Sequence, residues 1–196
     1  MTKYVVNSGG ISNSADLGKK FFQEIVKGLG NEPKLLFSFF AEKRENWEAK
    51  FADYSKGFSQ QIDVKPQIEL AMPDIFEKQV KESDAIYIHG GDDHLVQYWL
   101  KQYDLSKIFE GKVVATNSAS SNALSRQFWT CDWRKCFDGI GILPIKFISH
   151  YKSDYGNDDP RGPIDWDQAY KELEGYGDKS LPIHALKEGD FIVIEQ

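Results

Sequence analysis

The chain has 196 residues, of which 41% are hydrophobic and 14% aromatic, so it can bury a substantial core and is not expected to be disordered. Thirty acidic residues against 24 basic ones give a net charge of −6, which argues against a general nucleic-acid binder because phosphate contacts need a basic surface. No apolar run approaches the ~20 residues needed to span a bilayer, and the first run is too short for a signal peptide, so we expect a cytoplasmic protein without membrane contact.

Strands and helices alternate through the first half of the predicted chain. Short apolar runs predict strands at residues 4–7, 34–40, 67–72 and 85–89. Helical spacing of apolar residues predicts helices at 17–29, 41–59 and 73–82, and a further helix after residue 91 with an apolar stripe ending at Tyr103. We expect Asn13 or Ser14 to cap the first of these helices.

The second half of the chain continues the pattern. We expect a strand at 112–117, a helix at 120–128, a strand at 145–148, a polar surface excursion at 152–164, a helix at 165–175, and a final pair of strands, 181–186 and 190–195, around a turn. The alternation predicts an α/β protein with a parallel or mixed sheet and helices on both faces. Two cysteines, Cys131 and Cys136, are too few for a secreted disulfide framework and are expected to be reduced thiols.

In such a fold, the residues that bind and react with a substrate are expected just beyond the carboxyl ends of the strands. Three sharp turns fall there, at residues 90–91, 117–119 and 149–150. At the second turn a strand runs into Ser118, then small residues, then a helix, which is typical of a nucleophile elbow. The alternative is that Ser118 or Ser120 simply caps the helix.

The other two turns, and a later turn that contains Glu188, carry groups that could act together with a serine nucleophile. His150 ends a later strand and could act as general base, although a single histidine is more often structural. Glu188 lies in the turn between the last two strands, where it could orient His150 or remain a solvated acid. Gly90-Gly91 could present backbone N–H groups to an anion, or form a plain turn.

These segments, taken in order, resemble the peptidase E (aspartyl dipeptidase) and cyanophycinase family. The matching segments are Thr116–Ser120 at the elbow, Ile86–Asp92 at the glycine run, Phe137–Tyr151 before and around the histidine, and Leu186–Gly189 in the late turn. The resemblance spans nearly the whole chain and implies one domain, residues 1–196. It also implies a three-layer α/β/α, doubly wound and mostly parallel sheet of the flavodoxin-like, class I glutamine amidotransferase type.

The resemblance implies a serine peptidase that needs no metal or other cofactor and acts on short peptides as a monomer or homodimer. Its implied roles are nucleophile for Ser118, general base for His150 and orienting acid for Glu188, with Asp132 as the alternative acid. The oxyanion hole is expected from the backbone N–H groups of two further residues, Gly91 and Ala119.

An aspartyl dipeptidase must hold a substrate carboxylate, which requires a cation, preferably arginine. Arg161 in the polar excursion is the first candidate and Arg126 the second. His89 and Ser120 stand where the family usually has glycine, which favours an alternative: a relative that binds an amino-acid-like ligand without turnover. A nucleotide-binding domain that holds phosphate at Ser8-Gly9-Gly10 or Gly90-Gly91 ranks third, because neither segment is a Walker loop or a Gly-x-Gly-x-x-Gly fingerprint.

Overall fold

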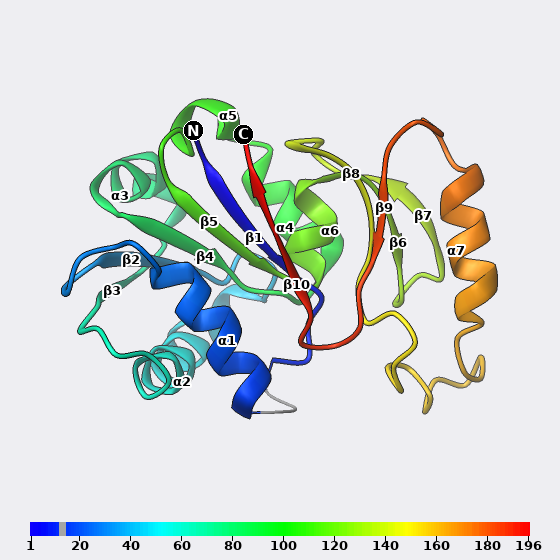
Figure 1. Cartoon of the computed structure of the whole chain (residues 1–196), viewed down its shortest axis with the longest axis horizontal. Helices are drawn as coiled ribbons and strands as arrows, with labels where there is room; N and C mark the ends of the chain where they lie inside the picture. The colour runs from blue at the N-terminus through cyan, green and yellow to red at the C-terminus, as the bar shows by residue number, and fades with distance from the viewer. Residues whose placement is uncertain (12–14) are drawn as a thin grey trace.

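The computed structural model describes residues 1–11 and 15–196 (Figure 1). The predicted cap at Asn13 or Ser14 therefore lies outside the described residues. The two termini lie close together at one end of the molecule, because the first and last strands of the described chain are neighbours (Figure 1).

A six-stranded sheet forms the larger part of the fold. Its strands, in the order β10-β1-β5-β4-β2-β3, are β10 (Phe191–Glu195), β1 (Lys3–Asn7), β5 (Val113–Asn117), β4 (Ala85–Ile88), β2 (Lys34–Ser38) and β3 (Gln67–Leu70). Every neighbouring pair is parallel except β1 with β10, which is antiparallel. The central strands are buried along their whole length, as expected for a sheet covered on both faces.

Helices in the connections cover this sheet, with α1 in front of it and α4 behind it in Figure 1. The helices are α1 (Ala15–Val26), α2 (Trp47–Ser59), α3 (Phe76–Glu82), α4 (Asp93–Leu100), α5 (Leu105–Ile108) and α6 (Ala119–Leu124). Aromatic rings fill the core under α1 and α2: Phe58 meets Phe22 at 4.7 Å and Phe37 at 5.2 Å between ring centroids. Truncating such a ring to alanine typically costs about 3–5 kcal/mol of stability. The fold is therefore α/β with a doubly wound, mostly parallel sheet, as predicted.

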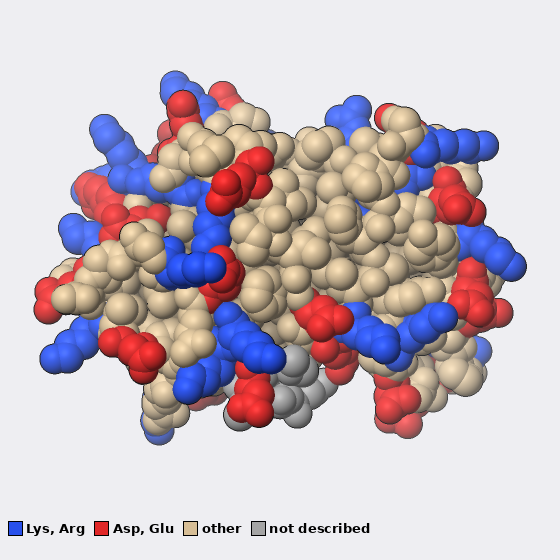
Figure 2. Space-filling view, in the orientation of Figure 1, with Lys and Arg blue, Asp and Glu red and all other residues tan. Residues whose placement is uncertain are grey.

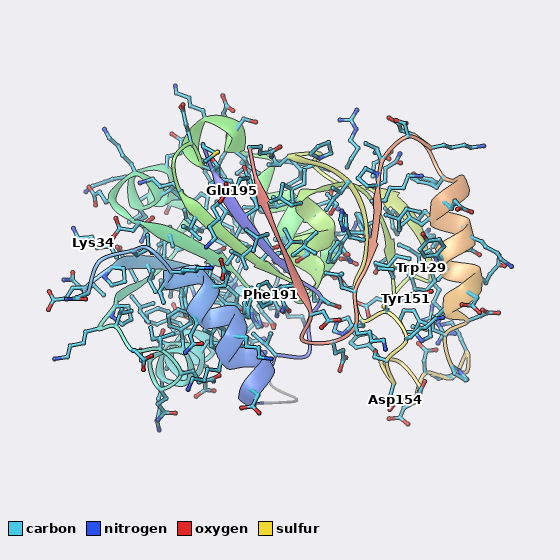
Figure 3. All side chains as sticks on the ribbon, viewed as in Figure 1. Lys34, Trp129, Tyr151, Asp154, Phe191 and Glu195 are labelled. Carbon is cyan, nitrogen blue, oxygen red and sulfur yellow. The ribbon has the colours of Figure 1, made fainter. Side chains whose placement is uncertain are left out.

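A second, four-stranded sheet stands beside the first and was not predicted. Its strands, in the order β7-β6-β8-β9, are β7 (Lys135–Asp138), β6 (Ser125–Thr130), β8 (Leu143–Ile148) and β9 (Ile183–Ala185). Helix α7 (Trp166–Gly175) packs against it, and Trp129 and Tyr151 lie between the sheet and this helix (Figure 3). The buried Lys146 ammonium donates to the carbonyls of Leu173, Glu174 and Tyr176 and so satisfies the carboxyl end of α7.

Two predicted elements are wrong in the second half of the chain. The helix predicted at 120–128 ends at Leu124, and residues from Ser125 onward form β6, because pairing with both β7 and β8 outweighs the local helical pattern. The last two strands are not a pair: β9 pairs with β8 in the second sheet, whereas β10 pairs with β1 in the first. The turn between them, which carries Glu188, therefore joins the two sheets.

The face in Figure 2 carries Lys and Arg beside Asp and Glu around its rim, with an uncharged area in the middle. No helix among the described residues has the length and apolar character that a membrane crossing requires. Cys131 and Cys136 are free thiols, as predicted, and burial raises the pKa of Cys136 to about 11.

Candidate active site

Ser118 occupies a strained turn between β5 and α6. Its backbone has φ 53° and ψ −112°, a conformation that non-glycine residues rarely adopt. The turn is held by hydrogen bonds from the Ser118 amide to the Asn7 carbonyl (3.0 Å) and from the Asn122 amide to the Ser118 carbonyl (3.0 Å). This is the geometry of a nucleophile elbow, in which the serine hydroxyl projects from the end of the sheet.

Ser118 Oγ, His150 and Glu188 form an unbroken hydrogen-bonded chain. Ser118 Oγ lies 2.8 Å from His150 Nε2, and Glu188 Oε1 lies 2.8 Å from His150 Nδ1. A carboxylate can only accept, so Nδ1 carries the imidazole proton and Nε2 is left to accept from the serine hydroxyl. The three side chains come from the ends of β5 and β8 and from the turn before β10, so the fold gathers residues up to 70 positions apart in the chain into one hydrogen-bonded arrangement, which is the arrangement of a serine nucleophile, a base and an orienting acid.

The first turn of the chain, Ser8-Gly9-Gly10, forms the floor under this triad. Ser8 Oγ accepts from the His150 amide and donates to the Leu186 carbonyl, both at 2.7 Å. A Cβ on Gly9 would lie 2.3 Å from His150 Cε1. Nothing in the local sequence indicates that the imidazole packs against this turn.

We therefore expect Gly9→Ala to lower activity at least 100-fold, since the added methyl must push the imidazole away from Ser118 and a displacement of ~1 Å costs ~10²-fold. Hydrolysis of a short peptide measures it. Gly28→Ala is the matched control, because Gly28 also has a positive φ (+83°) but no atom within 4 Å of an added Cβ. Equal activity of the two variants would contradict this role of Gly9.

Burial shapes the electrostatics of the base. The His150 side chain is almost fully buried, which lowers its pKa below the usual 6.5, while the neighbouring Glu188 carboxylate raises it again by a smaller amount. At neutral pH the imidazole is consequently uncharged, which is the form that can accept a proton.

A general base acts in its neutral form, so with His150 in that role we expect activity to be lost as the pH falls through the lowered pKa of this histidine. We expect the acidic limb of the kcat/KM profile to have its midpoint below pH 6.5. A pH–rate profile on one peptide measures it, and a midpoint above pH 7 would rule out this account of the imidazole.

The predicted oxyanion donors border the same pocket. Gly91 and Ala119 both line it together with Ser118 and His150. Ala119 is the first residue of α6, so its N–H has no acceptor within the helix. Gly90 lies against the elbow: a Cβ there would come within 2.6 Å of the Asn117 carbonyl oxygen. The glycine run thus approaches the nucleophile closely, and the oxyanion role of the two amides stays a prediction.

Comparison with known proteins decides the family. The family model for peptidase family S51 matches residues 5–196. The chain belongs to peptidase family S51. A match over nearly the whole chain also places Ser118, His150 and Glu188 within the S51 region, and membership supports peptidase, hence hydrolase, chemistry.

Solved structures show the same fold at low identity. A peptidase from an acI-B1 Actinobacterium superposes with a TM-score of 0.66 and 20% identity, covering 99% of this chain and 83% of the other. A protein from Listeria monocytogenes EGD-e described as a peptidase E superposes with a TM-score of 0.63 and 13% identity, covering 100% and 99%. No curated protein matches this S51 chain at a significant level.

His89 and Ser120 stand where S51 proteins usually have glycine, and neither side chain lines the pocket that contains Ser118. His89 turns into an aromatic cluster, with Tyr54 at 4.3 Å between ring centroids, and burial lowers its pKa to about 3, so it is neutral. Ser120 Oγ donates to the Ile88 carbonyl (2.6 Å) and accepts from the Asn117 amide (2.8 Å), so it braces the elbow.

The acid predicted as an alternative for orienting His150 has a different partner. Asp132 lines the pocket but its carboxylate accepts from the Tyr155 hydroxyl at 3.1 Å, whereas Glu188 occupies His150 Nδ1. A further acid, Asp93, was missed by the sequence analysis. It is buried in the pocket wall, where it accepts from Asn122 Nδ2 (2.9 Å) and Thr130 Oγ1 (2.5 Å), and burial raises its pKa to about 6.

Neither predicted arginine lines the pocket. The Arg161 guanidinium is bonded to the Asp159 carboxylate and to the Asp132 carbonyl (2.9 Å), so it stands at the rim. Arg126 is exposed near the start of β6 and lies beside Gly141, away from the residues that line the pocket. The structure thus brings Arg161, but not Arg126, near the site.

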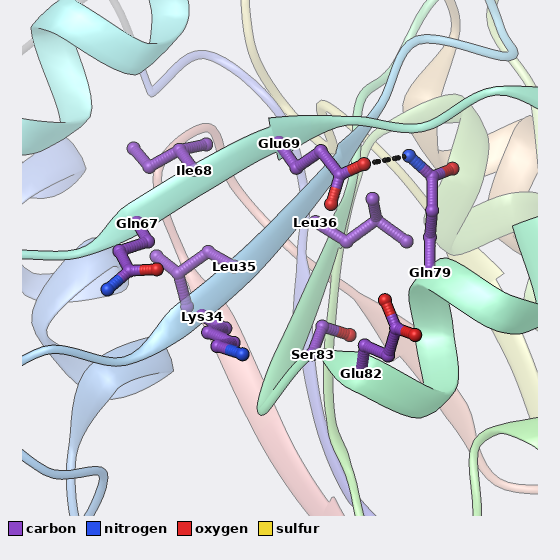
Figure 4. A pocket seen from close by; sticks show the side chains of 9 residues that line it. All are labelled: Lys34, Leu35, Leu36, Gln67, Ile68, Glu69, Gln79, Glu82 and Ser83. Atoms are coloured by element: carbon purple, nitrogen blue, oxygen red, sulfur yellow. Dashed lines mark hydrogen bonds between the residues drawn. The ribbon is translucent and has the colours of Figure 1, made fainter.

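Another pocket of this S51 protein lies between β2, β3 and α3 and is drawn in Figure 4. The Gln79 side chain is satisfied there: its Nε2 donates to Glu69 Oε1 at 2.6 Å, and its Oε1 accepts from the Met72 amide at 2.8 Å. It includes Lys34 at the start of β2, whereas Ser118 follows the end of β5, so the two pockets belong to different regions of the sheet.

Proposed function

We propose that this chain is a serine peptidase that hydrolyses short peptides through an acyl-enzyme, with Ser118, His150 and Glu188 as its triad. The observation that supports it most directly is the pair of 2.8 Å contacts from Ser118 Oγ through the His150 ring to Glu188. We place its activity in the cytoplasm, with a small peptide as its partner and no nucleic acid or membrane.

The mechanism follows from the proton positions. Ser118 Oγ attacks the scissile carbonyl carbon while His150 Nε2 takes its proton, and Glu188 stabilises the resulting imidazolium. The imidazolium returns that proton to the leaving amine, and the C–N bond breaks to leave an ester on Ser118. Water then attacks the ester carbonyl while His150 takes its proton, and the imidazolium passes that proton to Ser118 Oγ as the C–O bond breaks, which releases the acid product and restores the serine hydroxyl.

Charge on the tetrahedral intermediate would be stabilised by the amides of Gly91 and Ala119. Both residues border the pocket that contains Ser118. Loss of one such donor typically lowers turnover about 10²–10³-fold, so the two amides account for a large part of the expected rate.

The substrate is proposed to be a short peptide with a free amino terminus. Asp93 and Asp132, whose side chains border the pocket, are suited to an ammonium group. Peptides that begin with Asp are one form of this proposal, and they need a cation for the substrate carboxylate. Of the two candidate cations, Arg161 lies nearer to the pocket, at its rim, where Asp159 holds it.

If aspartyl peptides are preferred, we expect Arg161→Ala to lower kcat/KM for Asp-Leu at least tenfold and to leave Ala-Leu within twofold, because only the acidic side chain needs the cation. Arg126→Ala is the control, since Arg126 is exposed away from the pocket. Equal rates for Asp-Leu and Ala-Leu in the wild type would remove the aspartyl preference but not the peptidase. No hydrolysis of any short peptide would favour the alternative, a relative that binds its ligand without turnover.

A further inference from the structure

The polar excursion after β8, residues 152–164, lies against the catalytic histidine. The Tyr155 ring stacks on the His150 imidazole with 4.2 Å between centroids and 21° between planes. Tyr155 also lines the pocket that contains Ser118, yet 39% of its surface remains exposed. We call residues 152–164 the lid loop. One side of the imidazole is therefore covered by a residue that is itself on the surface.

Two contacts to Asp132, and others to Arg134, fasten the lid loop to the opposite wall of the pocket. The Tyr155 hydroxyl donates to Asp132 Oδ1 at 3.1 Å, and Arg161 donates to the Asp132 carbonyl at 2.9 Å. Asp132 belongs to the turn between β6 and β7, so the loop bridges from the end of β8 across to a different hairpin. Arg134, from the same turn, donates to the Gly162 and Pro163 carbonyls.

The lid loop is also internally bonded. Its turns are closed by backbone hydrogen bonds from Asn157 to Asp154, from Asp159 to Gly156 and from Gly162 to Asp159, at 2.8–3.1 Å. Asp154, labelled in Figure 3, extends from the lower edge of the loop away from the sheets. The ends of the loop are anchored elsewhere: Ile164 is buried in the core of the second sheet, and Trp166 Nε1 donates to the Ser153 carbonyl at 3.3 Å. The part between these anchors, which contains Tyr155, is therefore the part that can move when its contacts to Asp132 and Arg134 break.

The covered pocket is too small for a peptide. The free space in it is about enough for one water molecule. Two extended residues span up to ~7 Å. A substrate residue that enters this pocket must therefore displace the ring of Tyr155 or the whole loop.

We propose that the lid loop opens to admit substrate and closes over it, with Tyr155 as the residue that positions His150 and limits the length of the peptide. This inference rests on the proposed function for its substrate. In the closed position the Tyr155 ring lies on the imidazole and its hydroxyl on Asp132, which removes water from the base. A bound peptide holds the ring back from this position, and a longer chain holds it back further.

The test compares wild type, Tyr155→Phe and Tyr155→Ala, with Tyr98→Ala as a matched control because Tyr98 is an exposed tyrosine on α4. The readout is the ratio of hydrolysis rates for Ala-Ala-Ala-Ala-Ala-Ala and Ala-Ala. We expect Tyr155→Ala to raise this ratio at least tenfold, and Tyr155→Phe, which keeps the stack and loses one hydrogen bond, about fivefold. Tyr98→Ala should match wild type. An unchanged ratio in Tyr155→Ala would overturn the role in length selection.

A second readout separates positioning from mere folding. Three groups face His150: Glu188 before β10, Asp132 after β6 and Tyr155 in the lid loop. Removing the ring exposes the imidazole to water while both carboxylates stay. The acidic limb of the pH–rate profile should therefore move to higher pH in Tyr155→Ala and stay in place in Tyr98→Ala. No movement of the limb would overturn the positioning role.

A third readout does not depend on catalysis. Amide hydrogen exchange should be at least tenfold faster across residues 152–164 in Tyr155→Ala than in wild type, and unchanged in α7. If wild type hydrolyses no peptide but this difference appears, the proposed function fails and the lid stands. If exchange is unchanged, the lid fails whatever the activity.

Discussion

Replacing Ser118 by alanine should abolish peptide hydrolysis, with a fall in kcat of at least ~10⁴-fold, while the protein stays folded. The reason is that Ser118 Oγ supplies the atom that forms the acyl bond and lies 2.8 Å from the base. Alanine removes that atom and nothing else from the turn, whose backbone bonds to Asn7 and Asn122 do not involve the hydroxyl. Steady-state hydrolysis measures the loss of activity, and circular dichroism measures whether the variant stays folded.

Ser149→Ala is the control for the nucleophile, because Ser149 lines the same pocket but its hydroxyl donates to Asn122 Oδ1 at 3.0 Å. It should retain activity within about tenfold, the effect of one lost buried hydrogen bond. Loss of activity in Ser149→Ala with survival in Ser118→Ala would reverse the assignment of the nucleophile.

The second large effect is expected at the orienting acid. Glu188→Gln should lower kcat about 10²–10⁴-fold, because an amide in place of the carboxylate no longer fixes the imidazole tautomer or stabilises the imidazolium. Asp132→Asn should cost less than tenfold, since its carboxylate accepts from Tyr155 rather than from the imidazole. Parallel kcat measurements on the two variants, at a pH where His150 is neutral, compare the two acids directly.

The opposite order, with Asp132→Asn the more damaging change, would mean that Asp132 orients His150 in the working enzyme. Such a result would require the Tyr155 hydroxyl to leave Asp132 when substrate binds. The comparison therefore also reports on the loop that covers the pocket.

The residues of the candidate triad were predictable because each stands next to a local signal. Ser118 follows a buried strand and precedes small residues, His150 ends the apolar run of β8, and Glu188 lies in a glycine turn. Parallel strands bring their carboxyl ends to one edge of a sheet, so such signals converge in space. Most strands and helices of the first half follow from the same alternation of patterns.

What escaped prediction depends on contacts between distant segments. The second sheet forms because Ser125–Thr130 pairs with two other strands, and no periodicity in that segment reveals those partners. The fit of Gly9 against His150 joins residues 141 positions apart. Stacking of Tyr155 on His150 arises within a loop whose composition indicates only an exposed turn. Arg161 lies at the rim of the site in an ion pair with Asp159, two residues before it, and its role toward substrate stays a prediction.

The central claim is that Ser118 is an activated nucleophile, and covalent labelling tests it most directly. Wild type treated with a small alkyl fluorophosphonate should gain one adduct per chain, located by tandem mass spectrometry on the peptide that contains Ser118. Labelling should be lost in Ser118→Ala and should decline below the pKa of His150. An adduct on another serine, or equal labelling of wild type and Ser118→Ala, would contradict the account.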